Sequence, residues 1–573
     1  MPLGSQFSSL MLLLSTLDTS KPTVYKPKKE KVDKPVMFHR DDKINFLPRC
    51  LPSEVGIKDE YITSFFNEMS LDYSTRINRM IIAKDGYVIG EKYYYPYTKD
   101  SWDCVYSATK SVISLGLGAL LKEHNISVDT PAFKVLGIEK QVGNANCKKI
   151  TIRHLLTHST GNTFNEMESV STINWVKDYF ASGQKFKIGS KFEYNSMNTY
   201  ILSAIISKLS GKKTYDYLKE NIFDPLEMSE TYMETSFEGI TKGGWGLYIL
   251  PEDMVKLGLM IISKGVYKGK RIIDEDWINE ITKKQYPSSK QGHRFDYGYQ
   301  FWVSEEDNMH LMNGLYDQDI LMFPNTGIVI VVNGANPDAF HSSKMYDVAF
   351  KYFSKGIDGS LPIVKISNDR EIKNIDALDH YYRDIQNKKY YLIDKIATST
   401  SLLPVLLQNS FSTYGKGIKE VSFRYIDDKY YLYIKEDNKD YNIEFNFSRG
   451  VRQTLSFYKN IYDVHVDARF YLNEKSYPFL MIRLFFLEFA STRYITIKFD
   501  KRADVLSMEL SESPGLDFAN SLMEIQDAST KALVNNAIKL MNPDLFKSTI
   551  KKLFSPRFRI VEENEYLKLE KKK

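Results

Sequence analysis

The spacing of hydrophobic and polar residues changes several times along the chain. Residues 53–69 and 129–190 have mainly helical patterns, and between them two apolar runs, 79–83 and 87–91, flank Lys84-Asp85-Gly86. A glycine-containing turn between two strand-like runs is typical of a β-hairpin. The fold is therefore expected to begin with a helix and a hairpin and to continue as helices.

Strand-like patterns return further along the chain. Residues 297–302, 309–315, 319–323 and 328–332 are separated by short turns, and a helix is expected over 342–355. A helix and a hairpin open this region, and antiparallel strands with a helix close it. The two ends are therefore expected to share one sheet.

Beyond about residue 361 the pattern changes to alternating, aromatic-rich runs. Eight such runs predict a small closed β-barrel. They cover residues 421–426, 430–434, 441–447, 453–458, 462–472, 479–490, 493–499 and 505–510. The expected domains are a leader or flexible arm over 1–45, a first folded domain over 46–358, the barrel over 359–528 and a basic helical tail over 529–573.

The most apolar helix pattern begins at Ser107 and runs to about Leu121. Its apolar residues lie nearly all round the helix, as is typical of a helix enclosed by protein. Ser107 and Lys110 are three residues apart at its start, so they share one face. The amine of Lys110 is therefore expected beside the hydroxyl of Ser107, at the floor of a cleft.

This pair has the chemistry of an activated nucleophile. A serine hydroxyl reacts poorly at neutral pH, and a lysine accepts its proton only where burial or nearby positive charge keeps the amine neutral. The first turn of a helix also offers free amide groups to a developing oxyanion. On its own, this short motif is a weak signal of catalysis, and local pattern alone favours a helix N-cap serine followed by a lysine in the first turn.

Two histidines, His154 and His158, have the four-residue spacing of helical metal ligands. The residues between them, Leu155-Leu156-Thr157, lack the glutamate of the H-E-x-x-H zinc motif. We therefore interpret both histidines as structural, hydrogen-bonded near the end of a helix, and predict no metal site.

Composition narrows the classes of function. The 573 residues carry a net charge of +5, which is too small to indicate a nucleic-acid partner. Cys50, Cys104 and Cys147 are odd in number and widely spaced, so neither a disulfide framework nor a zinc cluster is predicted. No apolar run reaches the ~20 residues that cross a bilayer. The short apolar run 10–14 leaves a cleaved or truncated signal segment open.

Several separated motifs together resemble the serine β-lactamase and penicillin-binding-protein superfamily, in its branch of class C-like enzymes, esterases and 6-aminohexanoate-dimer hydrolases. The resemblance covers roughly residues 53–355. It rests on Ser107-x-x-Lys110, ITIRHLLTHSTG from Ile150, Tyr194-Asn195-Ser196, DMVKLGLMIISKGVYKGKRII from Asp253, YGYQFW from Tyr297, and Gly314-Leu315-Tyr316-Asp317-Gln318 before Pro324. The barrel resembles the lipocalin-like domains appended to some of these hydrolases, although a packing module without a ligand fits as well.

The resemblance implies an α/β (α+β) fold, with an antiparallel sheet flanked by helices, a helical subdomain, and an all-β, barrel-like C-terminal domain. Ser107 would be the acylated nucleophile and Lys110 its proton acceptor. Tyr194, which on local pattern alone fits an interfacial aromatic, would relay protons to the leaving group and later activate water. The N–H groups of Ser107 and Leu315 would form the oxyanion hole. Ser196, Asn198 and Trp245 are candidate substrate-binding residues.

Two departures from the family's pattern bear on the substrate. The third position of the tyrosine motif, asparagine in many β-lactamases, is Ser196, as in 6-aminohexanoate-dimer hydrolases and related esterases. The strand motif Lys/His-Thr/Ser-Gly reads Met312-Asn313-Gly314. Met312 supplies no cation for a substrate carboxylate, so neutral substrates are favoured over β-lactams unless another group, such as Arg294 or His310, binds the carboxylate.

The expected function is a serine hydrolase that cleaves an amide or ester bond of a small-molecule or peptide-like substrate, without a metal or organic cofactor. Two alternatives stay open. One is a D-Ala carboxypeptidase or β-lactamase, and the other is a binding or sensor protein that keeps the fold without turnover. The family favours a secreted or cell-envelope location, a cytoplasmic one stays open, and the oligomeric state is undetermined.

Overall fold

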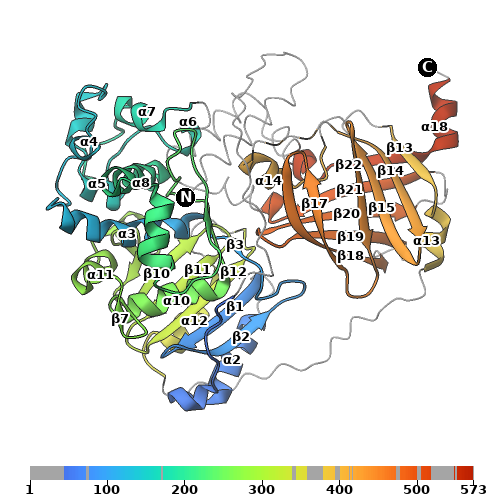
Figure 1. Cartoon of the computed structure of the whole chain (residues 1–573). Coiled ribbons are helices and arrows are strands. Elements are labelled where there is room, and N and C mark those ends of the chain that lie inside the picture. The colour runs from blue at the N-terminus through green and yellow to red at the C-terminus, as the bar shows by residue number, and fades with distance from the viewer. Residues whose placement is uncertain are drawn as a thin grey trace. The chain divides into compact units, whose positions relative to one another are not determined.

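The computed structural model describes residues 44–71, 76–169, 172–337, 343–357, 379–393, 400–411, 413, 415, 417–472, 478–499, 505–517, 548 and 551–571. The expected leader lies almost wholly outside the described residues, as do residues 529–547 of the expected tail. The described residues form two compact units, 44–357 and 379–571 (Figure 1).

The first unit is built around a seven-stranded antiparallel sheet in the order β2-β1-β12-β11-β10-β9-β8 (Figure 1). Its strands are β1 (Ile77–Lys84), β2 (Tyr87–Tyr93), β8 (Asp296–Tyr297), β9 (Trp302–Ser304), β10 (Met309–Gly314), β11 (Gln318–Phe323) and β12 (Ile328–Gly334). β1 pairs with β12, with Ile81 opposite Val331. The two ends of this region therefore share one sheet, which confirms the prediction.

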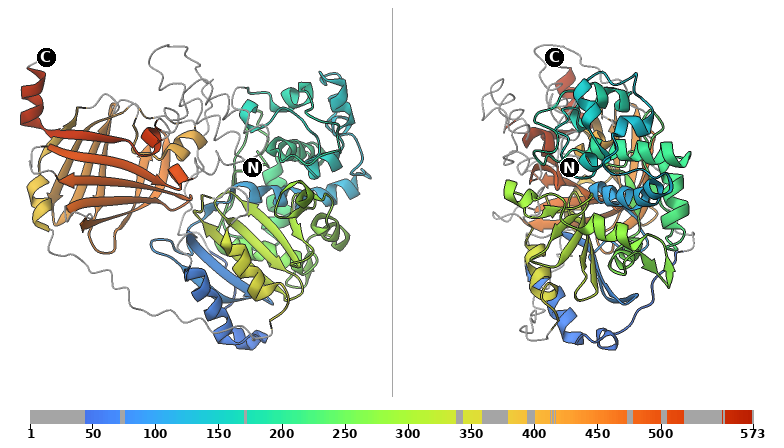
Figure 2. Two further views of the ribbon diagram at one scale, coloured as in Figure 1. Left: turned by 180° about the vertical axis from the view of Figure 1, so that it is seen from behind. Right: turned by 90° about the vertical axis from the view of Figure 1, so that its left-hand side faces the viewer.

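Helices cover both faces of this sheet (Figure 2). Along β1, Met80 and Ile82 belong to one apolar cluster, with α2 (Asp59–Leu71) and α12 (Lys344–Phe353). Ile81 and Ala83, which point the other way because side chains alternate along a strand, belong to a second cluster with α10 (Pro251–Ile262). The sheet is thus the middle layer of three.

A helical part adjoins the α10 face. Its central helices are α3 (Thr109–Glu123), preceded by the 3-10 turn η2 (Tyr106–Ala108), and α8 (Ser196–Ser210). The other helices are α4 (Ala132–Leu136), η3 (Ala145–Lys149), α5 (Ile152–Leu156), α6 (Glu166–Ser169), α7 (Trp175–Ala181), α9 (Thr214–Leu218), the π-helix η4 (Lys219–Phe223), α11 (Glu275–Thr282) and η5 (Ser288–Gln291). Short strands complete the unit: β3 (Asp103–Cys104), β4 (Tyr232–Met233), β5 (Leu247–Ile249), β6 (Val266–Tyr267) and β7 (Lys270–Arg271).

Two predicted elements are interrupted. The helix expected over 53–69 is a 3-10 turn, η1 (Pro52–Val55), that ends at Gly56 and is followed by α2. Gly56 has φ of 78°, a conformation that glycine adopts without strain. The strand expected over 297–302 is the β8–β9 hairpin, with Gln300 at φ of 65°. The Gln300 amide donates to the carbonyl of Leu156 at 2.8 Å, a tertiary contact that sequence spacing does not reveal.

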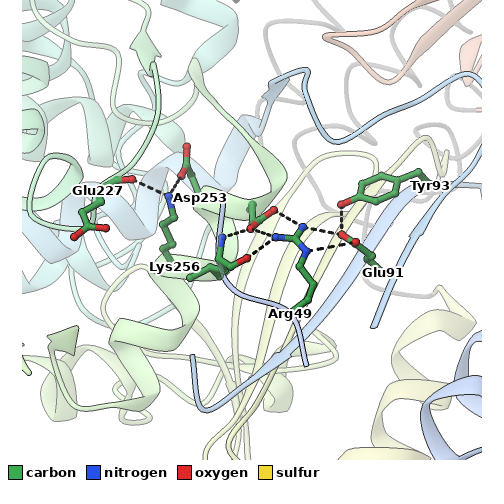
Figure 3. A network of polar contacts seen from close by, with 8 residues as sticks. Arg49, Glu91, Tyr93, Glu227, Asp253 and Lys256 are labelled. Atoms are coloured by element: carbon green, nitrogen blue, oxygen red, sulfur yellow. Dashed lines mark hydrogen bonds and ion pairs between the residues drawn. The ribbon is translucent and has the colours of Figure 1, made fainter. Parts of the chain in front are cut away.

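A network of charged residues ties the segment before η1 to α10 and β2 (Figure 3). Arg49 contacts Glu252 at 2.7 Å and Glu91 at 2.9 Å. Glu252, which is 2% exposed, also accepts a hydrogen bond from the backbone N–H of Leu47. Tyr93 donates to Glu91 at 2.8 Å. The buried carboxylate of Glu252 is thus satisfied by a cation and a backbone donor, as buried charges require.

The second unit is a nearly closed, ten-stranded antiparallel sheet in the order β16-β15-β14-β13-β22-β21-β20-β19-β18-β17 (Figure 1). Its strands are β13 (Lys389–Leu392), β14 (Ile418–Ile426), β15 (Lys429–Glu436), β16 (Lys439–Phe445), β17 (Val451–Phe457), β18 (Asn460–Leu472), β19 (Pro478–Phe486), β20 (Ser491–Phe499), β21 (Val505–Ser513) and β22 (Arg557–Glu562). Its described helices include α13 (Asp379–Ile385), α14 (Val405–Ser410) and α18 (Glu563–Glu570).

The barrel-like fold is confirmed, with ten strands instead of the eight expected. The two additional strands are β13 and β22, and β22 lies between β13 and β21. The segment expected as a helical tail therefore contributes a strand, in which Phe558 and Ile560 alternate with exposed arginines, before it ends in α18. The alternation is only six residues long, so sequence reading did not detect it.

Nowhere in the described ranges is a helix both long and apolar enough to cross a membrane.

Candidate active site

Ser107 lies in η2, directly before α3, and both it and Lys110 are buried. The preceding residue, Tyr106, has φ of 44°. Non-glycine residues in this conformation are uncommon and persist where the surrounding structure holds them. Tyr106 is held by an edge-on contact with Tyr316, whose ring centroid is 5.4 Å away. The hydroxyl of Ser107 is thereby fixed at the start of a buried helix.

The amine of Lys110 lies among three oxygen atoms. Its Nζ is 3.1 Å from Ser107 Oγ, 2.9 Å from Ser196 Oγ and 2.6 Å from the carbonyl oxygen of Gly244. Burial lowers the pKa of Lys110 from 10.5 to about 7, an effect opposed by the nearby carboxylate of Glu166. A large fraction of Lys110 is therefore neutral near physiological pH, with the Ser107 hydroxyl in hydrogen-bond reach.

Glu166 is a site residue that sequence reasoning missed. Its side chain is 3% exposed, and its Oε1 accepts the backbone N–H of Ser196 at 2.7 Å. A carboxylate at the first turn of α8 is favoured by the helix dipole. Nothing in the local pattern marked Glu166, because it approaches Lys110 only through the packing of α6 against the start of α8.

Tyr194 lies against Lys110 with the face of its ring. Nζ of Lys110 is 4.7 Å from the ring centroid. The ring also stacks on His158, with ring centroids 4.6 Å apart, and on Trp302, with centroids 5.9 Å apart. The structure therefore brings together three residues that were predicted to form one site, Ser107, Lys110 and Tyr194. The acid/base role of Tyr194 stays a prediction.

The two histidines have separate partners. His154 bonds to Thr151 at the start of α5, with Nδ1 2.9 Å from the hydroxyl oxygen. His158 is fully buried, and its Nδ1 lies 3.3 Å from the backbone N of Asn195 and 3.1 Å from the amide nitrogen of Asn198. Burial holds the pKa of His158 well below its usual range, so the ring that supports Tyr194 is neutral. Among the described residues no group of three His, Cys, Asp or Glu side chains could hold a metal ion.

The strand motif lies beside the nucleophile. A Cβ added to Gly314 would be 2.2 Å from the carbonyl oxygen of Val105, so only glycine lets β10 approach the turn that carries Ser107. Met312 is buried in the apolar cluster that contains Val105. The amide of Asn313 points to the other side of the sheet, where it donates to Asp319 at 2.7 Å.

The remaining candidates differ in their surroundings. Asn198 is fully buried, and its Oδ1 accepts hydrogen bonds from Thr160 and Tyr179. Trp245 is half-buried and packs on Trp175 at 6.0 Å.

Arg294 forms an ion pair with Asp347 of α12. His310 is half-buried on β10, and burial lowers its pKa to about 4, so it is neutral at physiological pH. Neither residue therefore presents an uncompensated positive charge near Ser107.

Comparison with known proteins assigns this fold to a class. The beta-lactamase family model matches residues 79–349. This part of the chain is therefore a domain of the β-lactamase and penicillin-binding-protein superfamily, as the sequence motifs predicted. The α/β fold with an antiparallel sheet flanked by helices is confirmed with it.

Two of the similar proteins carry the name of a hydrolase. The chain is 20% identical over 296 residues to 6-aminohexanoate-dimer hydrolase of Paenarthrobacter ureafaciens, covering 46% of this chain and 74% of that protein. An uncharacterised protein of Alkalihalophilus pseudofirmus is 24% identical over 220 residues, which cover 35% of this chain and 60% of that one. A solved structure of a candidate 6-aminohexanoate-dimer hydrolase from Bacillus anthracis has a TM-score of 0.46 and 19% identity, covering 56% of this chain and 89% of that one.

Proposed function

We propose that this protein is a serine hydrolase that cleaves an amide or ester bond through a covalent acyl-enzyme on Ser107. The observation that carries the proposal is the Lys110 amine, which lies 3.1 Å from Ser107 Oγ and whose pKa burial lowers to about 7, so that roughly half of it is neutral at that pH. A general base must be within hydrogen-bond reach of the proton it takes and have a pKa near the working pH. Lys110 meets both conditions.

The surroundings of Ser107 also suit the charge that develops during acyl transfer. Neither the N–H of Ser107 nor that of Leu315 donates a hydrogen bond within the described part of the chain. Both residues are buried, and β10 ends beside η2. Two such unpaired donors are what an oxyanion hole requires.

The geometry also bears on the alternatives. A protein that keeps the fold only for binding has no need of a lowered lysine pKa beside a serine hydroxyl, so the contacts of Lys110 favour turnover. Met312 supplies no positive charge, which favours neutral amides or esters over β-lactams and over peptides that end in a free carboxylate.

A fluorophosphonate probe tests the proposal directly. The full-length protein is expected to take up one equivalent, with the mass increase on the peptide that contains Ser107. Ser107→Ala is expected to abolish both the labelling and the hydrolysis of 4-nitrophenyl butyrate. A matched control is Ser114→Ala, which removes a buried serine about two helical turns beyond Ser107 and should label normally. Labelling of another residue, or hydrolysis that survives Ser107→Ala, would contradict the proposal.

A further inference from the structure

His158 contacts the segment that carries Tyr194 at three points. Its carbonyl oxygen accepts the backbone N–H of Glu193 at 2.8 Å, and its Nδ1 accepts the backbone N–H of Asn195 at 3.3 Å. Its ring also stacks on the ring of Tyr194, with centroids 4.6 Å apart and an angle of 29° between the planes. One histidine therefore holds the Tyr194 ring and the backbone on both sides of it.

The hydrogen bonds of His158 assign the lone pair to Nδ1. A backbone N–H can only donate, so the N–H of Asn195 requires an acceptor at Nδ1. The amide nitrogen of Asn198, which is also a donor, lies 3.1 Å from the same atom. The other end of that amide accepts hydrogen bonds from Thr160 and Tyr179. Two N–H groups therefore point at Nδ1.

These surroundings keep the ring neutral. A proton on Nδ1 would face both N–H groups, and the residue is fully buried. On the other side of the ring, Nε2 lies 3.3 Å from the amide nitrogen of Gln300, which donates to the carbonyl of Leu156. Burial, and to a lesser extent Lys110, hold the pKa of His158 well below its usual range. His158 is therefore a fixed acceptor that adds no second charge beside Lys110.

The backbone of His158 is also unusual. Its φ is 50°, a conformation that residues other than glycine adopt rarely. Such conformations persist where the surrounding structure holds them, and they are frequent at active sites.

The hydroxyl of Tyr194 has no comparable support. Tyr194 is half-buried, and its hydroxyl makes no hydrogen bond to a described residue. The position of the phenol oxygen is therefore set by the backbone and by the faces of the ring, one of which lies 4.7 Å from Lys110 Nζ. A group that transfers a proton must be held close to its reacting partners.

From these contacts we propose that His158 is a positioning residue, which holds the Tyr194 phenol where it can pass a proton from Lys110 to the leaving group. His158 acts through Tyr194 and takes no proton itself. The proposal rests on the proposed acyl-enzyme function and on the acid/base role predicted for Tyr194. It goes beyond the structural role that the sequence predicted for His158.

Two esters of one acid report whether the phenol is in place. 4-Nitrophenyl butyrate has a leaving group that departs as an anion, whereas the alkoxide of methyl butyrate must be protonated as it leaves. Both give the same acyl-enzyme, and kcat/KM reports acylation. Tyr194→Phe is expected to lower kcat/KM by roughly 10²–10⁴-fold on methyl butyrate, the usual effect of a lost general acid, and by much less on the 4-nitrophenyl ester.

Two variants each remove one contact of His158. His158→Phe keeps a ring against Tyr194 and removes Nδ1, whereas His158→Asn keeps an acceptor and removes the stacked ring. Each is expected to lower kcat/KM on methyl butyrate by roughly 10- to 10²-fold, as misplacing a catalytic group does, and to change the 4-nitrophenyl ester much less. Combined with Tyr194→Phe, neither should change the ratio of the two kcat/KM values further, because no phenol proton remains to be placed.

Controls separate positioning from a general loss of structure. His154→Phe is the matched control, because His154 bonds to Thr151 at the start of α5, and it should leave the ratio of the two kcat/KM values unchanged. The His158 variants should label with fluorophosphonate at Ser107 at a nearly normal rate, because Ser107 and Lys110 keep their contacts. Should one His158 variant fail to fold, the other still carries the test.

Three outcomes would overturn the positioning role while leaving the proposed function in place. One is an equal fall on both esters in the His158 variants, and another is a further fall of the ratio when they are combined with Tyr194→Phe. The third is a Tyr194→Phe protein with an unchanged ratio. A wild-type protein that hydrolyses neither ester, or that keeps its activity in Ser107→Ala, would instead refute the proposed function, and the positioning role with it.

Discussion

The ionisation of Lys110 should set the pH dependence of acylation. Lys110 accepts the Ser107 proton only when neutral, and its neutral fraction rises with pH through a pKa of about 7. We therefore expect kcat/KM to rise with pH and to level off above about pH 8. The measurement is the pH profile of kcat/KM for 4-nitrophenyl butyrate. A profile without a rise between pH 6 and 8 would exclude Lys110 as the base.

The charge of Glu166 allows a second test of Lys110 as the general base. Its carboxylate raises the pKa of Lys110, so Glu166→Gln should lower that pKa and move the rising limb of the profile to lower pH. Glu168→Gln, an exposed glutamate on the same short helix, is the matched control and should leave the limb in place. A limb that moves to higher pH in Glu166→Gln would show that the charge of Glu166 does not act on Lys110 in this way.

We expect Met312 to determine whether the site prefers substrates with or without a free carboxylate. The matched substrates are a depsipeptide with a free carboxylate on its leaving group and the methyl ester of the same compound. The native protein should prefer the methyl ester, because Met312 gives the free carboxylate no cation to compensate for the water that it loses on binding. The missing ion pair would contribute about 1.5–3 kcal/mol. Met312→Lys should narrow that gap in kcat/KM, whereas Met312→Leu should not. A native protein that prefers the free acid would point to another cation.

At the scale of secondary structure, the sequence predicted elements with strong periodicity and missed those that depend on distant contacts. The β1–β2 hairpin, β10 to β12 and α12 follow from alternation and turn residues. The turn at Gln300 depends on the carbonyls of α5, and β22 pairs with strands far away in sequence. For the site, Ser107 and Lys110 are close because they lie one turn apart, while Gly244 and Glu166 join them only through tertiary packing.

The approach of β10 to η2 is an element-scale feature that can be tested. In Gly314→Ala the new Cβ would be 2.2 Å from the Val105 carbonyl oxygen, so strand and turn must separate. We expect a destabilisation of about 1–3 kcal/mol and a large loss of fluorophosphonate labelling at Ser107. Gly183→Ala is the control, because its Cβ would find its nearest neighbour at 3.8 Å. Normal labelling in a folded Gly314→Ala protein would show that this close approach is not needed.

At the scale of the whole molecule, the chain combines two units with different kinds of core. The first unit has helices on both faces of its sheet, and all residues proposed for catalysis lie within it. The second closes a sheet almost into a barrel and contains a buried ion pair, Arg493 with Glu512, at 3.0 Å. Each unit has its own core, so damage to the second is expected to leave the chemistry of the first intact.

The Arg493–Glu512 pair allows the independence of the two units to be tested. Arg493 also donates to the carbonyl of Leu403 at 2.7 Å, and Glu512 accepts the N–H of Val405 at 2.8 Å, so the pair anchors α14 and the segment before it to β20 and β21. Glu512→Gln would leave the Arg493 charge buried without its partner, which typically costs about 3–5 kcal/mol. Calorimetry should show the melting transition of the second unit at a lower temperature, with kcat/KM at 25 °C unchanged. Lys498→Gln, which breaks a partly exposed pair with Glu509 in the same sheet, should shift that transition little. A loss of esterase activity in parallel with the second unit's unfolding would instead show that the hydrolase unit depends on the barrel.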